Sequence, residues 1–296
     1  MYLINLILNL AGMLLWASWR YLPFDPIQRA RPATLTGTLR RAEPLKFRRW
    51  HFLVALAVLL LLRPVFYWWV GGTMQWTLDV NVGVVNIAFR CDAFDRMLVF
   101  SLVSFADALF QFYLVLMLLW LCGPRNLDTD PCQRFVRIQL SPMHRWPHAV
   151  VLLLPFVVAA MDWMALQPLL ARMGIIPGAP SWERIVEQSL VLGLSVYAGC
   201  KHAIGVLLAL RFLNTYVYLG AHPIWNFVDQ SGKTLLRPLA PLHLQFRRMD
   251  FAPIIAIALT YLIATFLEEG LHIRIPGMQA SIDVPGLGDL FSVLMK

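Results

Sequence analysis

The sequence predicts an all-helical membrane protein, and three observations support this fold class. Hydrophobic residues make up 59% of the 296 residues and charged residues only 14%, whereas a soluble domain carries about 25% charged residues. Apolar runs long enough to cross a bilayer, which takes about 20 residues, recur along the whole chain. Two stretches of the chain also resemble each other, as is typical of membrane proteins built from duplicated groups of helices.

The apolar runs predict six membrane-spanning helices, of which the first is the shortest. They cover residues 2–19, 50–70, 97–121, 148–170, 185–211 and 251–268. No basic segment precedes the first run, and it ends in the bulky residues Trp16 and Trp19, where a signal peptidase needs small ones. We therefore predict that this run is a membrane helix and not a cleaved signal peptide.

The basic residues alternate between high and low numbers from one connection to the next. The first, third and fifth connections together hold 17 of the 25 Lys and Arg residues, whereas the second and fourth connections and the tail hold six. Because basic connections stay in the cytoplasm, we expect both chain ends to lie outside a bacterial cytoplasmic membrane. The basic inner side would attract anionic lipid headgroups, so the net charge of +8 needs no nucleic-acid partner.

The internal repeat has an offset of 88 residues. It matches DRMLVFSLV, which begins at Asp95, with ERIVEQSLV, which begins at Glu183. Further on, RFVRIQLSP from Arg134 matches TLLRPLAP from Thr234. Each copy holds two apolar runs around a basic connection, so the copies have parallel orientations. The chain is thus divided into an N-terminal extension, two tandem two-helix repeats and a tail, at residues 1–94, 95–182, 183–270 and 271–296.

Short β-like segments are expected on the outer side of the membrane. Residues 73–90 alternate around β-branched side chains, with a turn near Asn81–Gly83. Residues 271–285 have a similar pattern and precede the helix-like string GDLFSVLM. These segments predict a small extracytoplasmic cap, and a disordered tail agrees equally well with the second of them.

The most specific string of the sequence is PIWNFVDQSGKTLLRPLAPLHLQFRRMDFAPI at residues 223–254. We expect a short amphipathic turn at 223–228 and then an extended segment, because two closely spaced prolines disfavour a long helix. Asp250 precedes the last apolar run and can cap its helix. The fragment Ser231–Thr234 matches the end of a phosphate-binding loop, but Phe227 stands where that loop needs glycine, so no nucleotide site is expected.

This string resembles the YggT family of small bacterial and plastid membrane proteins, whose repeat carries a P-L-L-R-P-I-R…P…D-L-S-P pattern before a hydrophobic helix. The matching residues are Leu235, Leu236, Arg237, Pro238, Leu239, Pro241, Asp250, Phe251, Ala252 and Pro253. The family usually contains two units of two helices, and the resemblance covers residues 95–270. In the first copy Arg137 and Pro142 match the pattern, but Ile138 replaces a proline and no Asp precedes the next helix.

The resemblance implies a non-enzymatic membrane scaffold, because the family is linked to cell division and envelope organisation, to osmotic tolerance and to cytochrome assembly. Its motif residues would contact lipid headgroups or a membrane or cytoplasmic protein partner. These candidate contact residues are Arg137, Pro142, Arg237, Pro238, Pro241, Arg247, Arg248, Asp250 and Pro253.

Five ionisable residues fall inside the apolar runs, namely Arg63, Asp107, Asp162, Lys201 and His202. Because a lone charge at mid-membrane costs about 2.5–3.5 kcal/mol, we expect these groups to form a structural cluster or to line an ion path. Asp107 and Lys201 lie at similar depth and can pair. Arg63 can instead extend outward past Trp68 and Trp69.

Two alternatives to a scaffold stay open. One is a small ion or solute transporter that uses Asp107, Lys201 and His202. The other is a haem or cytochrome assembly factor with His202 as an axial ligand, although the other histidines lie in loops or at helix ends. No metal site, disulfide framework or catalytic set is predicted. Small residues between 193 and 205 predict close helix packing, either within one chain or in a homodimer.

Overall fold

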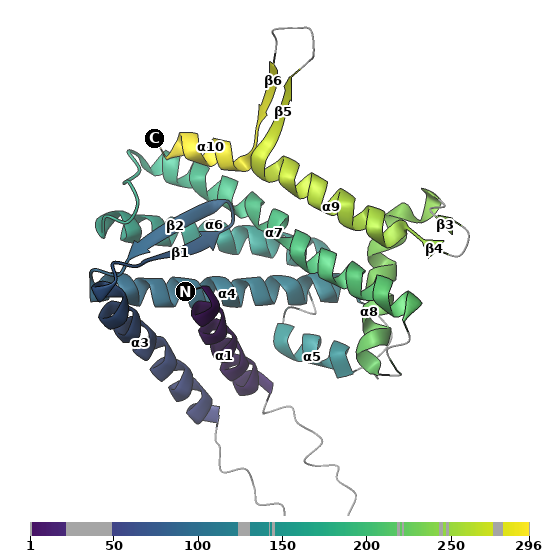
Figure 1. Ribbon diagram of the computed structural model, residues 1–296, viewed down its shortest axis with the longest axis horizontal. Helices are drawn as coiled ribbons and strands as arrows, with labels where there is room; N and C mark the ends of the chain where they lie inside the picture. The colour runs from purple at the N-terminus through teal and green to yellow at the C-terminus, as the bar shows by residue number, and fades with distance from the viewer. Residues whose placement is uncertain are drawn as a thin grey trace, which may run out of the picture. The chain divides into compact units, whose positions relative to one another are not determined.

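The predicted helical membrane architecture is confirmed. The computed structural model describes residues 2–21, 49–123, 131–141, 143, 146–217, 220, 222–242, 245–246, 249–274 and 281–295. Within these residues, six helices are long and apolar enough to cross a membrane (Figure 1). They are α1 (Tyr2–Tyr21), α3 (Arg49–Thr73), α4 (Phe94–Cys122), α6 (His148–Arg172), α7 (Trp182–Tyr216) and α9 (Ala252–Glu269). Their ends agree with the predicted spans to within five residues.

The chain forms two compact units. The first comprises residues 1–78, 89–111 and 137–141, and the second comprises residues 79–88, 112–136 and 142–296. Helices α4 and α5 (Pro131–Leu140) contribute to both units. The division into an extension, two repeats and a tail describes the sequence alone, and it stays a prediction.

In the first unit α1 packs against α3. Helix α3 contains Pro64, which has no N–H, so the carbonyl of Leu60 loses its usual partner within the helix. The hydroxyl of Ser101 on α4 donates a hydrogen bond to this carbonyl at 2.9 Å. A side chain from a neighbouring helix thus satisfies the freed carbonyl, which is how membrane helices tolerate proline.

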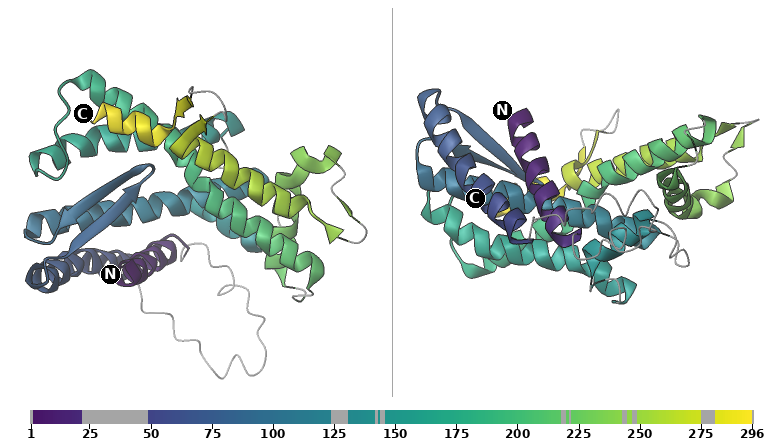
Figure 2. Two further views of the ribbon diagram at one scale, coloured as in Figure 1. Left: turned by 45° about the horizontal axis from the view of Figure 1, so that its top comes forward. Right: turned by 90° about the horizontal axis from the view of Figure 1, so that it is seen from below.

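In the second unit α7 packs against both α6 and α9, and α10 (Leu287–Leu294) packs against α7 (Figure 2). Glycines on α7 permit this close approach. A Cβ atom at Gly193 would lie 2.9 Å from the ring of Phe156, and one at Gly205 would lie 3.0 Å from the ring of Tyr261. These two small residues therefore serve packing within the chain, and a homodimer stays a prediction.

The predicted β segments form hairpins. Strands β1 (Thr77–Val82) and β2 (Val85–Arg90) pair around a turn at Gly83 and Val84. Gly83 has φ +59°, a conformation that glycine adopts without the steric cost of a side chain. Alternate side chains of both strands are buried, as the period-two pattern predicts.

The tail is folded in its described residues, so the disordered alternative is wrong for them. Strands β5 (Gly270–Arg274) and β6 (Ser281–Pro285) pair antiparallel, and α10 follows them. Two very short strands, β3 (Gln245–Phe246) and β4 (Met249–Asp250), pair before α9. The extracytoplasmic position of the tail stays a prediction.

The predicted extended segment of the motif is wrong. Helix α8 runs from Pro223 to Leu236, well beyond the expected short turn, and the 3₁₀ helix η3 (Arg237–Leu242) follows it. Pro223 opens α8 and Pro238 is the second residue of η3. The first turn of a helix tolerates proline because its N–H groups have no partner within the helix. Pro223 and Pro238 therefore lie in the first turns of helical segments, and Pro241 lies near the end of η3 instead of in an extended segment.

Candidate functional site

Arg63 is the centre of a buried polar cluster in the first unit. Its residue is only 2% exposed, so the side chain does not extend toward the membrane surface. The guanidinium donates hydrogen bonds to Asn9 Oδ1 at 2.8 Å, to Ser104 Oγ at 2.9 Å and to Asn5 Oδ1. These four side chains, from α1, α3 and α4, are hereafter the arginine centre.

Aromatic rings cover the arginine centre on its other side. The guanidinium carbon of Arg63 lies 5.2 Å from the ring centroid of Phe100 and 5.9 Å from that of Tyr67. The two rings meet edge to face at 5.6 Å, and both residues are fully buried. Cation–π attraction therefore adds to the hydrogen bonds. The cation is held by neutral acceptors and aromatic faces.

The two asparagines are not among the residues predicted from the apolar runs, because only ionisable groups were predicted there. Asn5 and Asn9 are four residues apart in α1, a spacing that places two side chains on one face of a helix. That spacing within an apolar run was the available signal. At the other end of α1, Arg20 donates to the carbonyls of Gln139 at 2.8 Å and Ser141 at 3.2 Å. Both ends of α1 are thus fixed by polar contacts.

Lys201 forms an ion pair with Glu268 in the second unit, and Asp107, the other predicted partner, belongs to the first unit. Lys201 lies on α7 and Glu268 in the last turn of α9. The carboxyl of Asp107 contacts Gln111 on its own helix, and Asp162 is exposed on α6. The partner of Lys201 is therefore an acid of its own unit, and the pairing with Asp107 stays a prediction.

His202, the proposed haem ligand, is exposed on α7. Its Nδ1 atom lies 3.2 Å from the hydroxyl of Tyr261 on α9. The two rings also meet edge to face, with centroids 5.8 Å apart. One imidazole nitrogen is therefore already engaged by a neighbouring helix.

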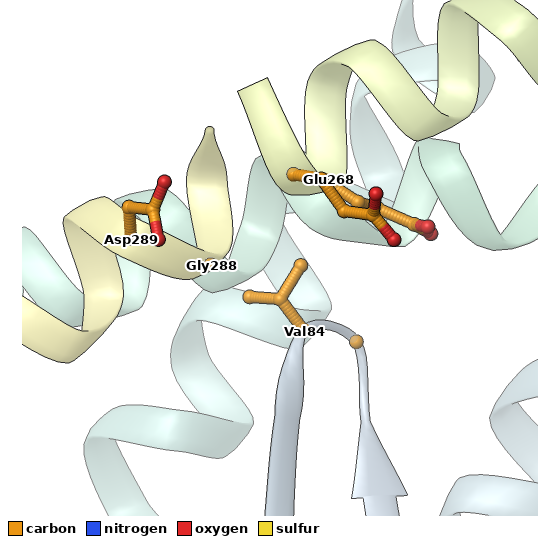
Figure 3. Close-up of a pocket in the computed structure, with 6 residues that line it drawn as sticks. Val84, Glu268, Gly288 and Asp289 are labelled. Atoms are coloured by element: carbon orange, nitrogen blue, oxygen red, sulfur yellow. The ribbon is translucent and has the colours of Figure 1, made fainter. Parts of the chain in front are cut away.

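An acidic cavity of about 410 Å³ lies beside this ion pair. It is lined by Gly83, Val84, Glu268, Glu269, Gly288 and Asp289. Val84, at the tip of the β1–β2 hairpin, points toward the space between Glu268 and Asp289 (Figure 3). Lys201 neutralises one of the three carboxylates. Among the described residues, no group of three or more His, Cys, Asp or Glu side chains is placed to hold a metal ion.

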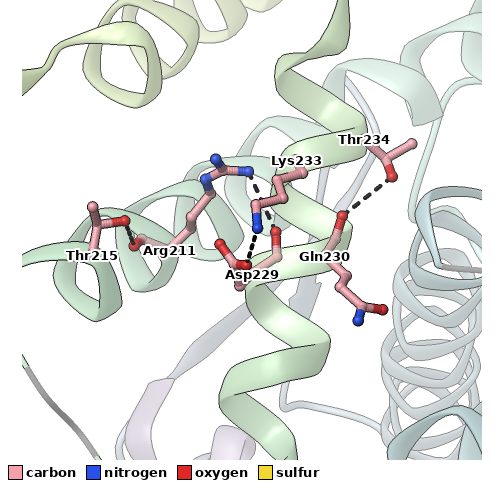
Figure 4. Close-up of polar contacts among 6 residues, drawn as sticks. All are labelled: Arg211, Thr215, Asp229, Gln230, Lys233 and Thr234. Carbon is pink, nitrogen blue, oxygen red and sulfur yellow. Dashed lines mark hydrogen bonds and ion pairs between the residues drawn. The ribbon is translucent and has the colours of Figure 1, made fainter.

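The motif helix α8 is held against α7 by a polar junction (Figure 4). Arg211 on α7 donates to the main-chain carbonyl of Asp229 at 3.3 Å, and Lys233 approaches the Asp229 carboxylate at 2.6 Å. A Cβ atom at Gly232 would lie 2.5 Å from Cδ of Arg211. Glycine is thus required where the arginine stem crosses α8, and the fragment that resembled a phosphate-binding loop is part of a helix.

The apolar and charged residues of the motif have separate roles. Leu236 is buried with Leu208 of α7 and Ala256 of α9, whereas Arg237 and Pro238 are exposed. In the part of the chain that the structure describes, the Arg237 side chain has no hydrogen bond or ion pair. The motif therefore packs through its leucines and leaves its arginine outward.

Asp250 binds the start of the last membrane helix, as predicted, although Phe251 holds the N-cap position. Its carboxylate accepts a hydrogen bond from the N–H of Ala252, the first residue of α9, at 3.0 Å. Its own N–H donates to the hydroxyl of Tyr216 at the end of α7, at 2.7 Å. The following Pro253 is buried. Asp250 thus ties the start of α9 to the end of α7.

The first copy of the motif is only partly described. Arg137 is half-buried in the last turn of α5. Pro142, Arg247 and Arg248 lie outside the described residues, as does the side chain of Pro241. The expected contacts of these residues with lipid or a partner stay predictions.

Cys91 is a buried thiol between β2 and α4. Burial, and secondarily the nearby charge of Asp92, raise the pKa of this thiol above its ordinary value. A Cβ atom at Gly71, near the end of α3, would lie 2.9 Å from its sulfur. Cys91 is therefore a poorly reactive thiol that reports on the packing of the first unit.

No family model, no curated protein and no solved structure matches the chain. The resemblance of residues 223–254 to the YggT motif therefore stays a prediction. Any functional conclusion rests on the geometry of the polar clusters and of the motif.

Proposed function

We propose that this protein is a non-enzymatic membrane scaffold of the YggT type in a bacterial cytoplasmic membrane. In this proposal the α8–η3 segment contacts anionic lipid headgroups and a membrane or cytoplasmic protein partner. The observation that carries the proposal is the outward position of Arg237 on a segment whose leucines are anchored between α7 and α9.

The position of the motif agrees with an interfacial role. Helix α8 crosses the ends of α7 and α9 instead of continuing along them (Figure 1), as expected for a helix in the plane of a membrane interface. A guanidinium binds phosphate or carboxylate groups through two parallel hydrogen bonds. Pro238 follows directly and restricts the backbone next to the arginine. An exposed arginine on a restricted backbone is thus available to an acidic or phosphate group.

Substitution of Arg237 tests this proposal. We expect Arg237→Ala to abolish cross-linking and co-purification of the partner from native membranes, with membrane insertion unchanged. Lys233→Ala is the matched control, because Lys233 lies four residues before Arg237 in the last turn of α8 but is already paired with Asp229, and it should retain the partner. Unchanged co-purification with Arg237→Ala would contradict the scaffold.

The orientation can be tested separately. We expect a cysteine introduced at the exposed Ala240 to react with a membrane-impermeant maleimide only in inverted vesicles, because basic connections stay inside. Labelling of this cysteine in whole cells would contradict the predicted orientation.

An ion or solute transporter is the second candidate, and the acidic cavity next to the Lys201–Glu268 pair favours it. Polar groups in membrane helices commonly mark such paths. Flux of ions into vesicles that contain the protein, lost in Asp107→Asn, would favour the transporter. Absence of flux together with loss of the partner in Arg237→Ala would favour the scaffold.

A further inference from the structure

The arginine centre has more hydrogen-bond donors than acceptors. Arg63 carries five N–H donors, and the structure gives three of them protein acceptors. The Nε atom is buried without an acceptor in the described part of the chain, and so is the hydroxyl of the neighbouring Tyr67. Two adjacent, fully buried groups thus present N–H and O–H donors with no acceptor.

Ser104 makes the shortage of acceptors greater. Its hydroxyl oxygen is approached by donors from Arg63 at 2.9 Å, from Asn9 at 3.2 Å and from Asn5 at 3.3 Å. A hydroxyl oxygen has only two lone pairs, so it cannot satisfy three donors fully. The Tyr67 oxygen is close enough to Arg63 to interact with the guanidinium as an acceptor, and the phenol O–H then still has no acceptor.

The centre also carries an uncompensated positive charge. Within the described residues, Arg63 forms no ion pair, and no carboxylate interacts electrostatically with it. The nearest acid along α4, Asp107, contacts Gln111 instead. A water molecule would supply two acceptor lone pairs, but it would also add two donors and would leave the charge uncancelled. An anion would supply acceptors alone and would cancel the charge, and a buried charge is normally paired.

We infer that the arginine centre, together with the hydroxyl of Tyr67, binds a small monovalent anion of the size of chloride. The depth of the site excludes a lipid phosphate. Arg63 lies ten residues before the end of α3 at Thr73, which is about 15 Å along the helix and close to the middle of a hydrocarbon core about 30 Å thick. This inference does not depend on the proposed scaffold function.

Chloride is the probe for the test. The full-length protein is placed in phosphatidylcholine nanodiscs, and its thermal unfolding is followed in sodium chloride and in sodium gluconate at equal sodium concentration. We expect a saturable rise of the unfolding temperature with chloride, because a ligand that binds only the folded state stabilises it. The response should be lost in Arg63→Gln. It should persist in Lys233→Gln, which alters an exposed cation far along the chain.

Tyr67→Phe keeps the inference testable if Arg63→Gln does not fold. This variant removes one O–H donor and preserves the ring against Phe100, so the fold should remain intact. We expect its chloride affinity to fall about tenfold or more, because hydrogen bonds to charged groups are the stronger kind. An unchanged affinity in Tyr67→Phe would overturn the inference.

Two further outcomes would also overturn it. One is an unfolding temperature that is the same in chloride and gluconate. The other is stabilisation by anionic phosphatidylglycerol in the nanodisc that depends on Arg63 while chloride has no effect, since a lipid phosphate would then be the anion.

Discussion

The arginine centre of the first unit and the Lys201–Glu268 pair of the second unit each place a cation on a membrane-spanning helix. Arg63 is 2% exposed and is held by neutral side chains of two other helices. Lys201 and Glu268 have side chains that are 15% and 27% exposed, and they neutralise each other. The first solution retains a net charge inside the fold, whereas the second does not.

The two units therefore depend on different interactions for their stability. A buried cation without a carboxylate depends on every acceptor around it, because the loss of one partner leaves the charge less compensated. A partly exposed ion pair that loses one member can turn toward water or headgroups. We therefore expect the first unit to be sensitive to polar substitutions and the second to depend more on apolar packing around α7.

The largest effect should come from removing the acceptors of Arg63. In the double variant Asn5→Leu, Asn9→Leu, the guanidinium loses two of its three hydrogen-bond acceptors. We expect destabilisation of about 3–6 kcal/mol, because each of the two lost hydrogen bonds to a charged group contributes about 1.5–3 kcal/mol. Denaturant unfolding in detergent measures this change.

The triple variant with Arg63→Met added is its control. It removes the charge and its acceptors together, so a large part of the lost stability should return. A double variant as stable as the natural chain would mean that the asparagines do not hold the arginine.

The next largest effect should come from Gly193→Leu in the second unit. The new side chain would begin 2.9 Å from the ring of Phe156 and 3.0 Å from its backbone oxygen, so α6 and α7 must separate. Overpacking of this kind costs about 1–3 kcal/mol. Leu190→Ala, at an exposed position of the same helix, should be close to neutral by comparison. If Gly193→Leu leaves the stability unchanged but changes the oligomeric state, Gly193 lies in a homodimer contact instead.

A smaller effect is expected for Lys201→Met. Interhelical polar contacts in membranes contribute about 0.6 kcal/mol on average and at most about 1.7 kcal/mol. The pair is also partly exposed, so Glu268 can be solvated when its partner is lost. Denaturant unfolding should show a change well below that of the asparagine variant. An equal or larger loss would contradict the ranking of the two centres.

The six spans could be predicted because a span needs only about 20 apolar residues, a requirement that composition alone reveals. The partners of the polar groups could not be predicted in the same way. Glu268 lies in the last turn of α9, and Lys201 reaches it from α7. The two residues are far apart in the chain, and their predicted depths in the membrane differ, so the sequence did not indicate this pair.

The structure of the motif could be predicted from the sequence only in part. Pro238 and Pro241 were expected to extend the chain, but they lie in the 3₁₀ helix η3. The first turn of a helix tolerates proline, and Pro238 lies there. Pro241 lies near the end of η3, so the helical segment is short. The cap at Asp250 was predictable, because capping depends on a local pattern of one acidic residue before an apolar run.

The last prediction concerns Cys91, whose labelling rate tests the comparison of the two units with almost no change in stability. In a chain with Cys122, Cys132 and Cys200 changed to serine, N-ethylmaleimide should label Cys91 more slowly than a peptide thiol, because burial raises its pKa and the thiolate is the reactive form. A raised pKa favours the protonated folded state, so its contribution to stability is present at neutral pH. This contribution is lost only as the pH rises through the folded-state pKa.

The labelling rate of Cys91 also shows whether a substitution opens the first unit. Cys91 and the arginine centre both belong to the first unit, so the asparagine double variant should accelerate labelling strongly. Lys201→Met alters the second unit and should leave the labelling rate unchanged. Equal acceleration in both variants would show that the two units unfold together, and the contrast between a charge-dependent and a packing-dependent unit would then describe one cooperative structure.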